Sequence, residues 1–130
     1  ILDGAHCDYA AARLAYQLKK DKFFLISDAT FLGRKVANFK WENFDAHLEN
    51  GFYRNEEGNL AGASISMEEA VQNAYKYLNV SADEAIKMAT SRVAAAINME
   101  DEIGKIKVGF PASFVTFNDD LSKMESLVIN

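Results

Sequence analysis

Two short apolar runs, each ending on a side chain that can transfer a proton, constrain the fold of this chain more than any other feature. Residues 1–6 (ILDGAH) form the first run and residues 23–28 (FFLISD) form the second, so His6 and Asp28 stand at their ends. Both runs are typical of short buried β-strands. An ionised carboxylate at the end of such a strand is costly unless a neighbouring group favours its charge.

A helix is predicted between these two strands. Asp8 can cap it, and the sequence AAARLAYQLKK continues it to about Lys20, with Leu14 and Leu18 one turn apart on one face. A strand, a helix and a strand within so few residues are the repeating unit of a parallel sheet. The chain is therefore predicted to be of the α/β class.

Residues 29–60 have no helical period and contain Gly33, Gly51 and Gly58. We expect a long loop holding a small hairpin, built from FKWENF (39–44) and GFYRN (51–55) and followed by a turn. Loops of this length inside compact domains are usually lids or binding elements.

Two more helices are predicted from their capping signals. Ser66 and Glu69 form an S-x-x-E box in front of an apolar helix face, and Ser81 and Glu84 repeat the pattern in front of a helix that runs through Val93. The tail has turn signals at Gly104 and at Gly-Phe-Pro, followed by predicted strands at 112–117 and 125–129.

Composition excludes several classes of function. The net charge is −5 with a sequence pI near 5.0, and the basic residues are scattered, which argues against nucleic acid as a partner. The single Cys7 forbids an internal disulfide and suits a reducing compartment. No apolar run is long enough to span a bilayer and no signal peptide is visible, so we expect a soluble cytoplasmic protein without a membrane partner.

The two strand ends carry the candidate chemistry. In parallel α/β folds catalytic groups gather at the carboxyl ends of strands, where Asp28 and His6 are predicted to lie. A carboxylate there can take a proton from an attacking water and return it to a leaving group. A histidine there can donate a hydrogen bond to a substrate oxygen or bind a metal ion.

Structural explanations compete with these roles. Asp28 could simply cap the following turn, and His6 could be a structural histidine. His47 lies in a polar stretch and is expected to be exposed, while Cys7, adjacent to His6, should point to the opposite face of its strand. The glycine segment Leu60-Ala61-Gly62-Ala63-Ser64 fits either the approach of main chain to a ligand or a tight turn. With two histidines and no Cys pair, the chain lacks the usual three-ligand hydrolytic metal site.

Several motifs in order resemble one family. LDGAHCD, FLISDAT, NEEGNLAGASISMEEAVQNA, VSADEAIKMATSRVAAAI and GKIKVGFPASFVTFN are together similar to the C-terminal third of the N-acetylglucosamine-6-phosphate deacetylase family of the amidohydrolase superfamily. The similarity is weakest over residues 31–52. It implies an α/β fold: the C-terminal part of a metal-dependent (β/α)8 (TIM) barrel plus strands of a small β-sandwich domain.

The resemblance also implies domain boundaries. Residues 1–100 would be the last two β/α units of the barrel, with residues 1–6 and 23–28 as its seventh and eighth strands and residues 29–60 as the loop over the pocket. Residues 101–130 would be strands of the small β-domain.

The resemblance further implies roles for individual residues. Asp28, the aspartate of the DAT motif, would be the general base and acid, close to a metal-bound water. His6 would contact the substrate, and the main chain of Leu60, Ala61 and Gly62 would line the sugar site. A divalent metal, zinc or iron, would activate the water that hydrolyses the acetamide of N-acetylglucosamine 6-phosphate to glucosamine 6-phosphate and acetate.

Some positions depart from the family pattern, and the metal ligands are expected outside this chain. Ser27 stands where Thr is usual, Ala63 where Ser is usual, and Ser113 where Asp is usual, but none of these changes affects Asp28 or His6. The chain begins and ends in apolar strand-like residues, so we expect a fragment that lacks the N-terminal part of its parent. We expect the fragment alone to be inactive and to bind no metal, and the parent to be a homodimer.

Two alternatives stay open from the sequence. One is a fragment of another amidohydrolase that acts on cyclic amides or aminoacyl groups. The other is a non-catalytic domain that binds sugar phosphates.

Overall fold

The structure, a computed structural model, describes residues 1–128 of the chain. In chain order the elements are α1 (Tyr9–Lys19), the 3-10 helix η1 (Lys20–Lys22), β1 (Asn38–Trp41), β2 (Phe44–Glu49), β3 (Phe52–Arg54), α2 (Met67–Tyr77), α3 (Ala82–Ala89), α4 (Ser91–Ala96), β4 (Phe114–Phe117) and β5 (Met124–Val128).

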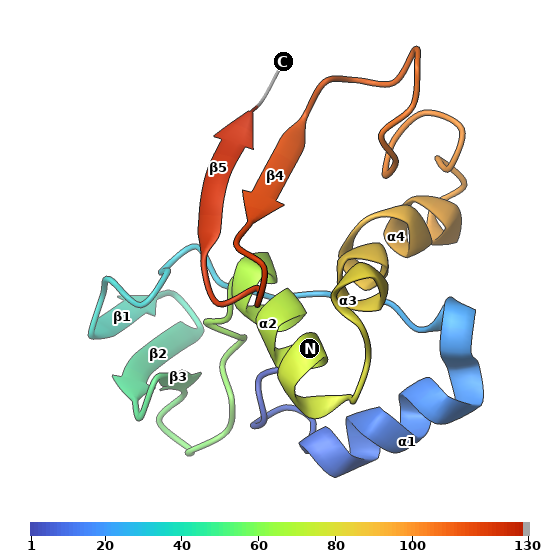
Figure 1. Ribbon diagram of the computed structural model, residues 1–130. Helices are drawn as coiled ribbons and strands as arrows, with labels where there is room; N and C mark the ends of the chain where they lie inside the picture. Colours follow the sequence, from blue (N-terminus) through green and yellow to red (C-terminus); the bar gives the residue numbers. More distant parts are fainter. Residues whose placement is uncertain (129–130) are drawn as a thin grey trace.

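Helices α2 and α3 form the centre of the molecule (Figure 1). Helix α1 lies on one side of them, the sheet β1–β3 lies on the other, and the hairpin β4–β5 stands beside α2 (Figure 1). The main core joins all these parts except the sheet. Its buried side chains are Leu2, Ala12, Leu25, Ala63, Ile65, Ala70, Val71, Ala74, Leu78, Ala85, Met88 and Leu121.

Side-chain caps fix the starts of the helices as the sequence predicts. The Asp8 carboxylate accepts from the N–H of Ala10 at 2.8 Å at the start of α1. At α2 the box is complete, because Ser66 and Glu69 each accept a backbone N–H from the other. At α3 the Ser81 hydroxyl accepts from the N–H of Glu84 at 3.2 Å. Each such cap typically stabilises a helix by about 1 kcal/mol.

The predicted continuous helix after Ser81 is instead two helices that meet at Thr90. The Thr90 hydroxyl donates to the carbonyl of Ile86 at 2.8 Å, a back-bond that commonly bends helices. Gly104 packs against this junction, where an added Cβ would lie 2.9 Å from the Cβ of Ala94. A short-range capping pattern could not show this long-range contact.

The segment predicted as a loop with a small hairpin forms a three-stranded antiparallel sheet in the order β1-β2-β3. The sheet has its own apolar cluster, in which Leu32, Ala46 and Tyr53 are buried. His47 is therefore half-buried in β2, and its prediction as an exposed loop residue is wrong.

The regular strands predicted at residues 1–6 and 23–28 are not formed. Residues 3–7 are bends, and residues 23–27 run as an extended stretch outside the named strands (Figure 1). The N–H of Leu25 bonds to the carbonyl of Met88 at the end of α3, and the carbonyl of Asp28 accepts from the N–H of Ala63, both at 2.9 Å. A strand requires a row of backbone bonds to a lateral partner, and such isolated bonds within the described chain do not make one.

Leu14 and Leu18, predicted to lie one turn apart on one face of α1, are 57% and 75% exposed, and Ala12 is the buried residue of that helix. One boundary in the tail needs correction. The first tail strand begins at Phe114 rather than at residue 112. The second, β5, pairs with it in antiparallel fashion from Met124, and Ile129 of the predicted range lies outside the described residues.

Helices within residues 1–128 are all too short or too polar to cross a bilayer.

Candidate functional site

Asp28 lies at the end of the extended segment and has an unusual backbone. Its φ is 49°, in the left-handed region that costs an L-residue roughly 1–2 kcal/mol, although Asp tolerates it better than most residues do. The residue is exposed, contrary to the buried carboxylate expected from the sequence, and within residues 1–128 no donor is hydrogen-bonded to its side chain. A free carboxylate on a constrained backbone can exchange protons with a bound molecule.

The segment Leu60–Gly62 runs directly past Asp28. The N–H of Ala63 donates to the carbonyl of Asp28, and the N–H of Thr30 donates to the carbonyl of Ala63, both at 2.9 Å. These bonds make a parallel bridge between Ala29 and Ala63. The structure thus brings together two of the predicted parts of the site, the carboxylate and the glycine segment.

Gly62 is required by this close approach. Its φ is 80°, and a Cβ built on it would lie 2.5 Å from the Cγ2 of Thr30. The hydroxyl of Thr30 is buried without a hydrogen-bond partner in the described part of the chain. Backbone and side chains beside Asp28 are therefore packed with no room for a larger residue at position 62.

His6 is held by a carboxylate that the sequence analysis did not single out. The Oδ2 of Asp3 lies 2.7 Å from the Nδ1 of His6, and the Oδ1 of Asp3 accepts from the N–H groups of Ala5 and His6 at 3.0 and 2.9 Å. The side chain of Asp3 is 4% exposed and that of His6 is 19% exposed. Burial alone raises the pKa of Asp3, but the hydrogen bonds from His6 and Ala5 outweigh it and lower that pKa below its ordinary value.

Aromatic packing fixes the loop that carries this pair. Gly4 has φ 81°, and a Cβ on it would lie 2.9 Å from the ring of Tyr9. Tyr9 in turn stacks on Tyr77, with ring centroids 3.8 Å apart. The only sequence signal for Asp3 was its place three residues before His6 in the D-G-x-H motif, a spacing at which a bend brings the two side chains together.

An ion pair joins the segment before β1 to helix α2. The guanidinium of Arg34 contacts both oxygens of Glu69, at 2.8 and 2.9 Å, and its Nε donates to the hydroxyl of Ser64 at 3.2 Å. Partial burial raises the pKa of Glu69, but hydrogen bonds from Arg34 and from the N–H of Ser66 outweigh it and leave that pKa below its ordinary value. Asp3, Arg34 and Glu69 all line one open pocket of about 360 Å³.

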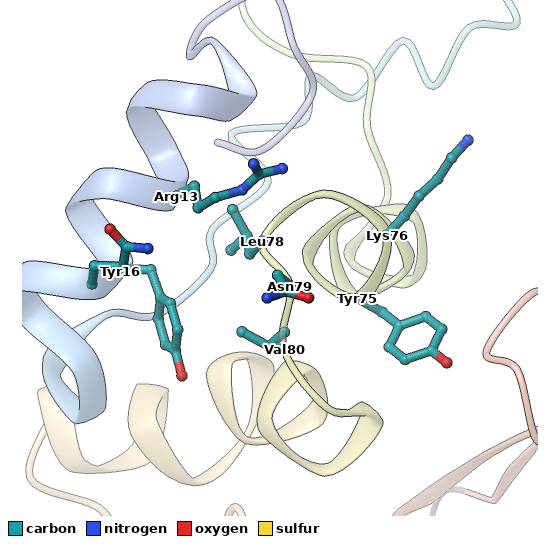
Figure 2. A pocket seen from close by; sticks show the side chains of 8 residues that line it. Arg13, Tyr16, Tyr75, Lys76, Leu78, Asn79 and Val80 are labelled. Atoms are coloured by element: carbon teal, nitrogen blue, oxygen red, sulfur yellow. The ribbon is translucent and has the colours of Figure 1, made fainter.

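A larger pocket than this one lies elsewhere in the described chain (Figure 2). It has a volume of about 590 Å³ and lies between α1 and the link from α2 to α3. Its lining contains neither a carboxylate nor a histidine, and Arg13 in it is already bonded to the carbonyl of Tyr77 at 2.9 and 2.6 Å. Size alone therefore does not identify the site, because this pocket contains none of the residues that the sequence predicts for the chemistry.

The remaining candidates are distributed as follows. No hydrogen bond joins His6 to Asp28 or to Leu60–Gly62 within residues 1–128. The thiol of Cys7 contacts the carbonyl of Asp8 at 3.6 Å and not the His6 ring. No group of three His, Cys, Asp or Glu side chains within the described residues could hold a metal ion.

Comparison with known proteins adds the family context. Residues 6–129 match the profile of the amidohydrolase family. An N-acetylglucosamine-6-phosphate deacetylase of Haemophilus influenzae is 28% identical over 98% of this chain and 34% of that enzyme. An N-acetylgalactosamine-6-phosphate deacetylase of a Shewanella species is 32% identical over 92% of this chain and 31% of that enzyme.

Solved structures show the same relationship. The crystal structure of N-acetylglucosamine-6-phosphate deacetylase from Pasteurella multocida superposes on 98% of this chain with a TM-score of 0.91 at 29% identity. The matched part is 34% of that protein. The chain therefore spans about a third of the length of each of these three relatives.

Proposed function

Because the chain belongs to the amidohydrolase family, we propose that it is the C-terminal part of a metal-dependent deacetylase that acts on N-acetylglucosamine 6-phosphate. The reaction would yield glucosamine 6-phosphate and acetate. Residues 1–100 would complete a (β/α)8 barrel, and the strands of the tail would belong to a small β-sandwich. The proposed parent is cytoplasmic and dimeric.

The observation that carries this proposal is the pairing of Asp28 with the Leu60–Gly62 segment. Two backbone hydrogen bonds of 2.9 Å join Ala63, the residue directly after that segment, to Asp28 and Thr30, while the Asp28 carboxylate has no hydrogen-bond partner within residues 1–128. A carboxylate beside this segment is suited to transfer a proton to or from a molecule bound along the main chain of Leu60–Gly62.

Asp28 is proposed to act twice on the proton of the attacking water. First it accepts that proton while the water oxygen bonds to the acetamide carbonyl carbon. It then gives the proton to the amide nitrogen as the C–N bond breaks, so the amine leaves neutral and the acetyl group leaves as acetic acid, which loses its remaining proton to the solvent and becomes acetate. The main chain of Leu60, Ala61 and Gly62 would line the sugar site, and His6 would contact the substrate.

Members of the amidohydrolase family generally depend on a divalent metal, but the donors of this chain do not build a site for one. No suitable group of three ligands exists within residues 1–128. The zinc or iron of the parent would therefore be held by another part of the parent, which corresponds to the part of the relatives that this chain does not match.

One observation supports N-acetylgalactosamine 6-phosphate as a second candidate substrate. The Shewanella relative named for N-acetylgalactosamine 6-phosphate is 32% identical to this chain, against 28% for the Haemophilus relative named for N-acetylglucosamine 6-phosphate. The two substrates differ only in the orientation of one hydroxyl group. N-acetylgalactosamine 6-phosphate is accordingly the second candidate substrate.

The test is a substrate comparison with the complete product of the gene that contains this chain. N-acetylglucosamine 6-phosphate, N-acetylgalactosamine 6-phosphate and a dihydropyrimidine are supplied with zinc, and released acetate or ring-opened product is measured. Deacetylation of the first sugar with the highest kcat/KM supports the proposal. A preference for the second sugar selects the alternative substrate, and activity on the cyclic amide alone would refute both.

A further inference from the structure

We propose that Asp3 is a positioning residue for His6, whose carboxylate holds a proton on Nδ1 so that Nε2 is the nitrogen the ring presents to a substrate. The inference rests on the proposed function in one respect, the role of His6 as a substrate contact. It adds a residue and a defined state of the ring to that role.

The hydrogen bonds of Asp3 occupy both of its oxygens. Oδ1 accepts from two backbone N–H groups, at 2.9 and 3.0 Å, and this fixes the carboxylate plane. Oδ2 is then directed at Nδ1 of His6, 2.7 Å away. The Asp3 side chain is only 4% exposed, so water does not compete effectively for these bonds.

A carboxylate can only accept hydrogen bonds, and this fixes the proton on the ring. Nδ1 must donate, whether the imidazole is neutral or protonated. Nε2 is then an acceptor in the neutral ring and a donor in the protonated ring. A neutral imidazole in water favours the opposite tautomer, with its proton on Nε2, so Asp3 would impose a state that the side chain does not choose by itself.

The rest of the loop supports an orienting role. Nε2 of His6 has no hydrogen-bond partner within residues 1–128, while Nδ1 is fully used by Asp3. Gly4 between them is confined by the ring of Tyr9, which is stacked on Tyr77 at the end of α2. The ring is thus held at Nδ1 and has no partner at Nε2 within residues 1–128, an arrangement that a hydrogen-bonded carboxylate commonly gives to a functional histidine.

This arrangement predicts which groups His6 can recognise. When the ring is neutral, Nε2 accepts a hydrogen bond from a sugar hydroxyl or a bound water. When it is protonated, Nε2 donates to an anionic oxygen such as that of a phosphate, with the Asp3 carboxylate balancing the charge. In neither state does the ring offer a second donor to the substrate.

Asp3→Asn separates positioning from simple structural support. The amide oxygen can keep the two backbone hydrogen bonds, which leaves the NH2 group facing Nδ1. A donor at this position requires Nδ1 to accept, so the ring proton moves to Nε2. The loop is retained and the tautomer is inverted, as happens when an orienting aspartate is changed to asparagine in a catalytic triad.

The experiment is 15N NMR of the histidine rings in the 130-residue chain, at a pH where the ring is neutral. The chain has two histidines, so His47→Gln assigns the signals of His6. In the wild type Nδ1 is expected at the protonated and Nε2 at the unprotonated chemical shift, and in Asp3→Asn the two are expected to exchange. Asp8→Asn is the matched control, because Asp8 caps α1 through Ala10 and should leave the His6 tautomer unchanged.

The result that overturns the proposal is equally direct. If the neutral wild-type ring carries its proton on Nε2, Asp3 does not set its state, whether or not Asp3→Asn folds. Retention of the Nδ1 proton in a folded Asp3→Asn chain also contradicts the role of the carboxylate. Neither reading requires turnover, so failure of the substrate comparison leaves this test intact and failure here leaves that comparison intact.

Discussion

The Asp28 backbone is held in a left-handed conformation by bonds to the segment that passes it. The carbonyl of Asp28 accepts from the N–H of Ala63, and Gly62 passes so close that a Cβ there would overlap Thr30. Unusual backbone conformations persist where the surrounding structure enforces them, often at functional sites. The conformation of Asp28 therefore depends on the absence of a side chain at position 62.

Gly62→Ala is predicted to destabilise the chain more than the equivalent change at an open glycine. Gly58→Ala is the matched control, since Gly58 has a similar φ of 84° but nothing within 4 Å of an added Cβ. The control should lose about 1–2 kcal/mol from the left-handed conformation alone. Gly62→Ala should lower the free energy of unfolding by a further 1–3 kcal/mol, roughly, because the added Cβ overpacks the site. Urea unfolding measures both variants.

Thr30→Ser is the rescue for this prediction. It removes the Cγ2 atom that an alanine at position 62 would meet at 2.5 Å. The double variant should recover most of the extra loss. Equal destabilisation by Gly62→Ala and Gly58→Ala would show that the close approach beside Asp28 does not exist.

At this scale the sequence could indicate some residues and not others. Asp28 and His6 stand out because each ends an apolar run, a local signal. Asp3 does not, because its importance comes from a bend that turns both of its oxygens toward the residues that follow it. The exposure of Asp28 was also not predictable, since it depends on which segments cover it.

Between elements, the ion pair of Arg34 with Glu69 joins the segment leading to the β1–β3 sheet to the first turn of α2. Both oxygens of Glu69 are engaged by Arg34, and Glu69 also completes the capping box of α2. Because the hydrogen bonds leave the Glu69 pKa below its ordinary value of 4.5, the unfolded chain binds this proton more readily than the folded chain. The stability that the ionised Glu69 contributes to the folded chain is present above pH 4.5 and is lost as the pH falls through the pKa of Glu69 in the folded chain.

Glu69→Gln is predicted to remove this part of the acid sensitivity. Glutamine can keep the capping box, so the change mainly removes the charge that Arg34 contacts. The free energy of unfolding at about pH 6 exceeds that in acid, and this difference should become smaller by less than about 1 kcal/mol in the variant. The effect is small because the Glu69 side chain is 38% exposed and solvent screens the ion pair. Glu102→Gln, an exposed change without a side-chain partner within residues 1–128, should leave the pH dependence unchanged. An identical pH profile for both variants would contradict the account of this ion pair.

The elements differ in how far local sequence determined them. Helix starts follow from caps such as Asp8, Ser66 and Ser81, whose partners are two or three residues away. Strands depend on partners distant in sequence, so the segments at 1–6 and 23–28 looked like strands but form no regular strand within residues 1–128. The β2 strand was missed for the same reason, since its polar residues pair with β1 and β3 rather than follow an apolar pattern.

At the scale of the whole molecule, several apolar side chains of α1 and of the segment 23–28 are exposed to solvent. Phe24, Ile26, Leu14 and Leu18 are between 41% and 75% exposed. The chain also spans about a third of the Haemophilus influenzae and Pasteurella multocida enzymes. In the proposal above, Asp28 lies in this chain and the metal ligands lie in another part of the parent.

The 130-residue chain alone is therefore predicted to show no deacetylation of N-acetylglucosamine 6-phosphate, even with added zinc. The reason is that residues 1–128 contain no group of three metal-ligating side chains that could hold the ion near Asp28. Acetate release is measured against zinc without protein and against the complete gene product. Turnover by the chain well above the zinc-only rate would refute the assignment of metal binding to other residues.

Asp28→Asn in the complete gene product tests the central claim most directly. Asparagine tolerates the left-handed backbone, so the fold should persist while the group that accepts and returns the proton is lost. General acid–base groups contribute typically 10²- to 10⁴-fold, so kcat for deacetylation of N-acetylglucosamine 6-phosphate should fall by at least about 100-fold with unchanged thermal stability. Wild-type kcat in a folded Asp28→Asn enzyme would contradict the account.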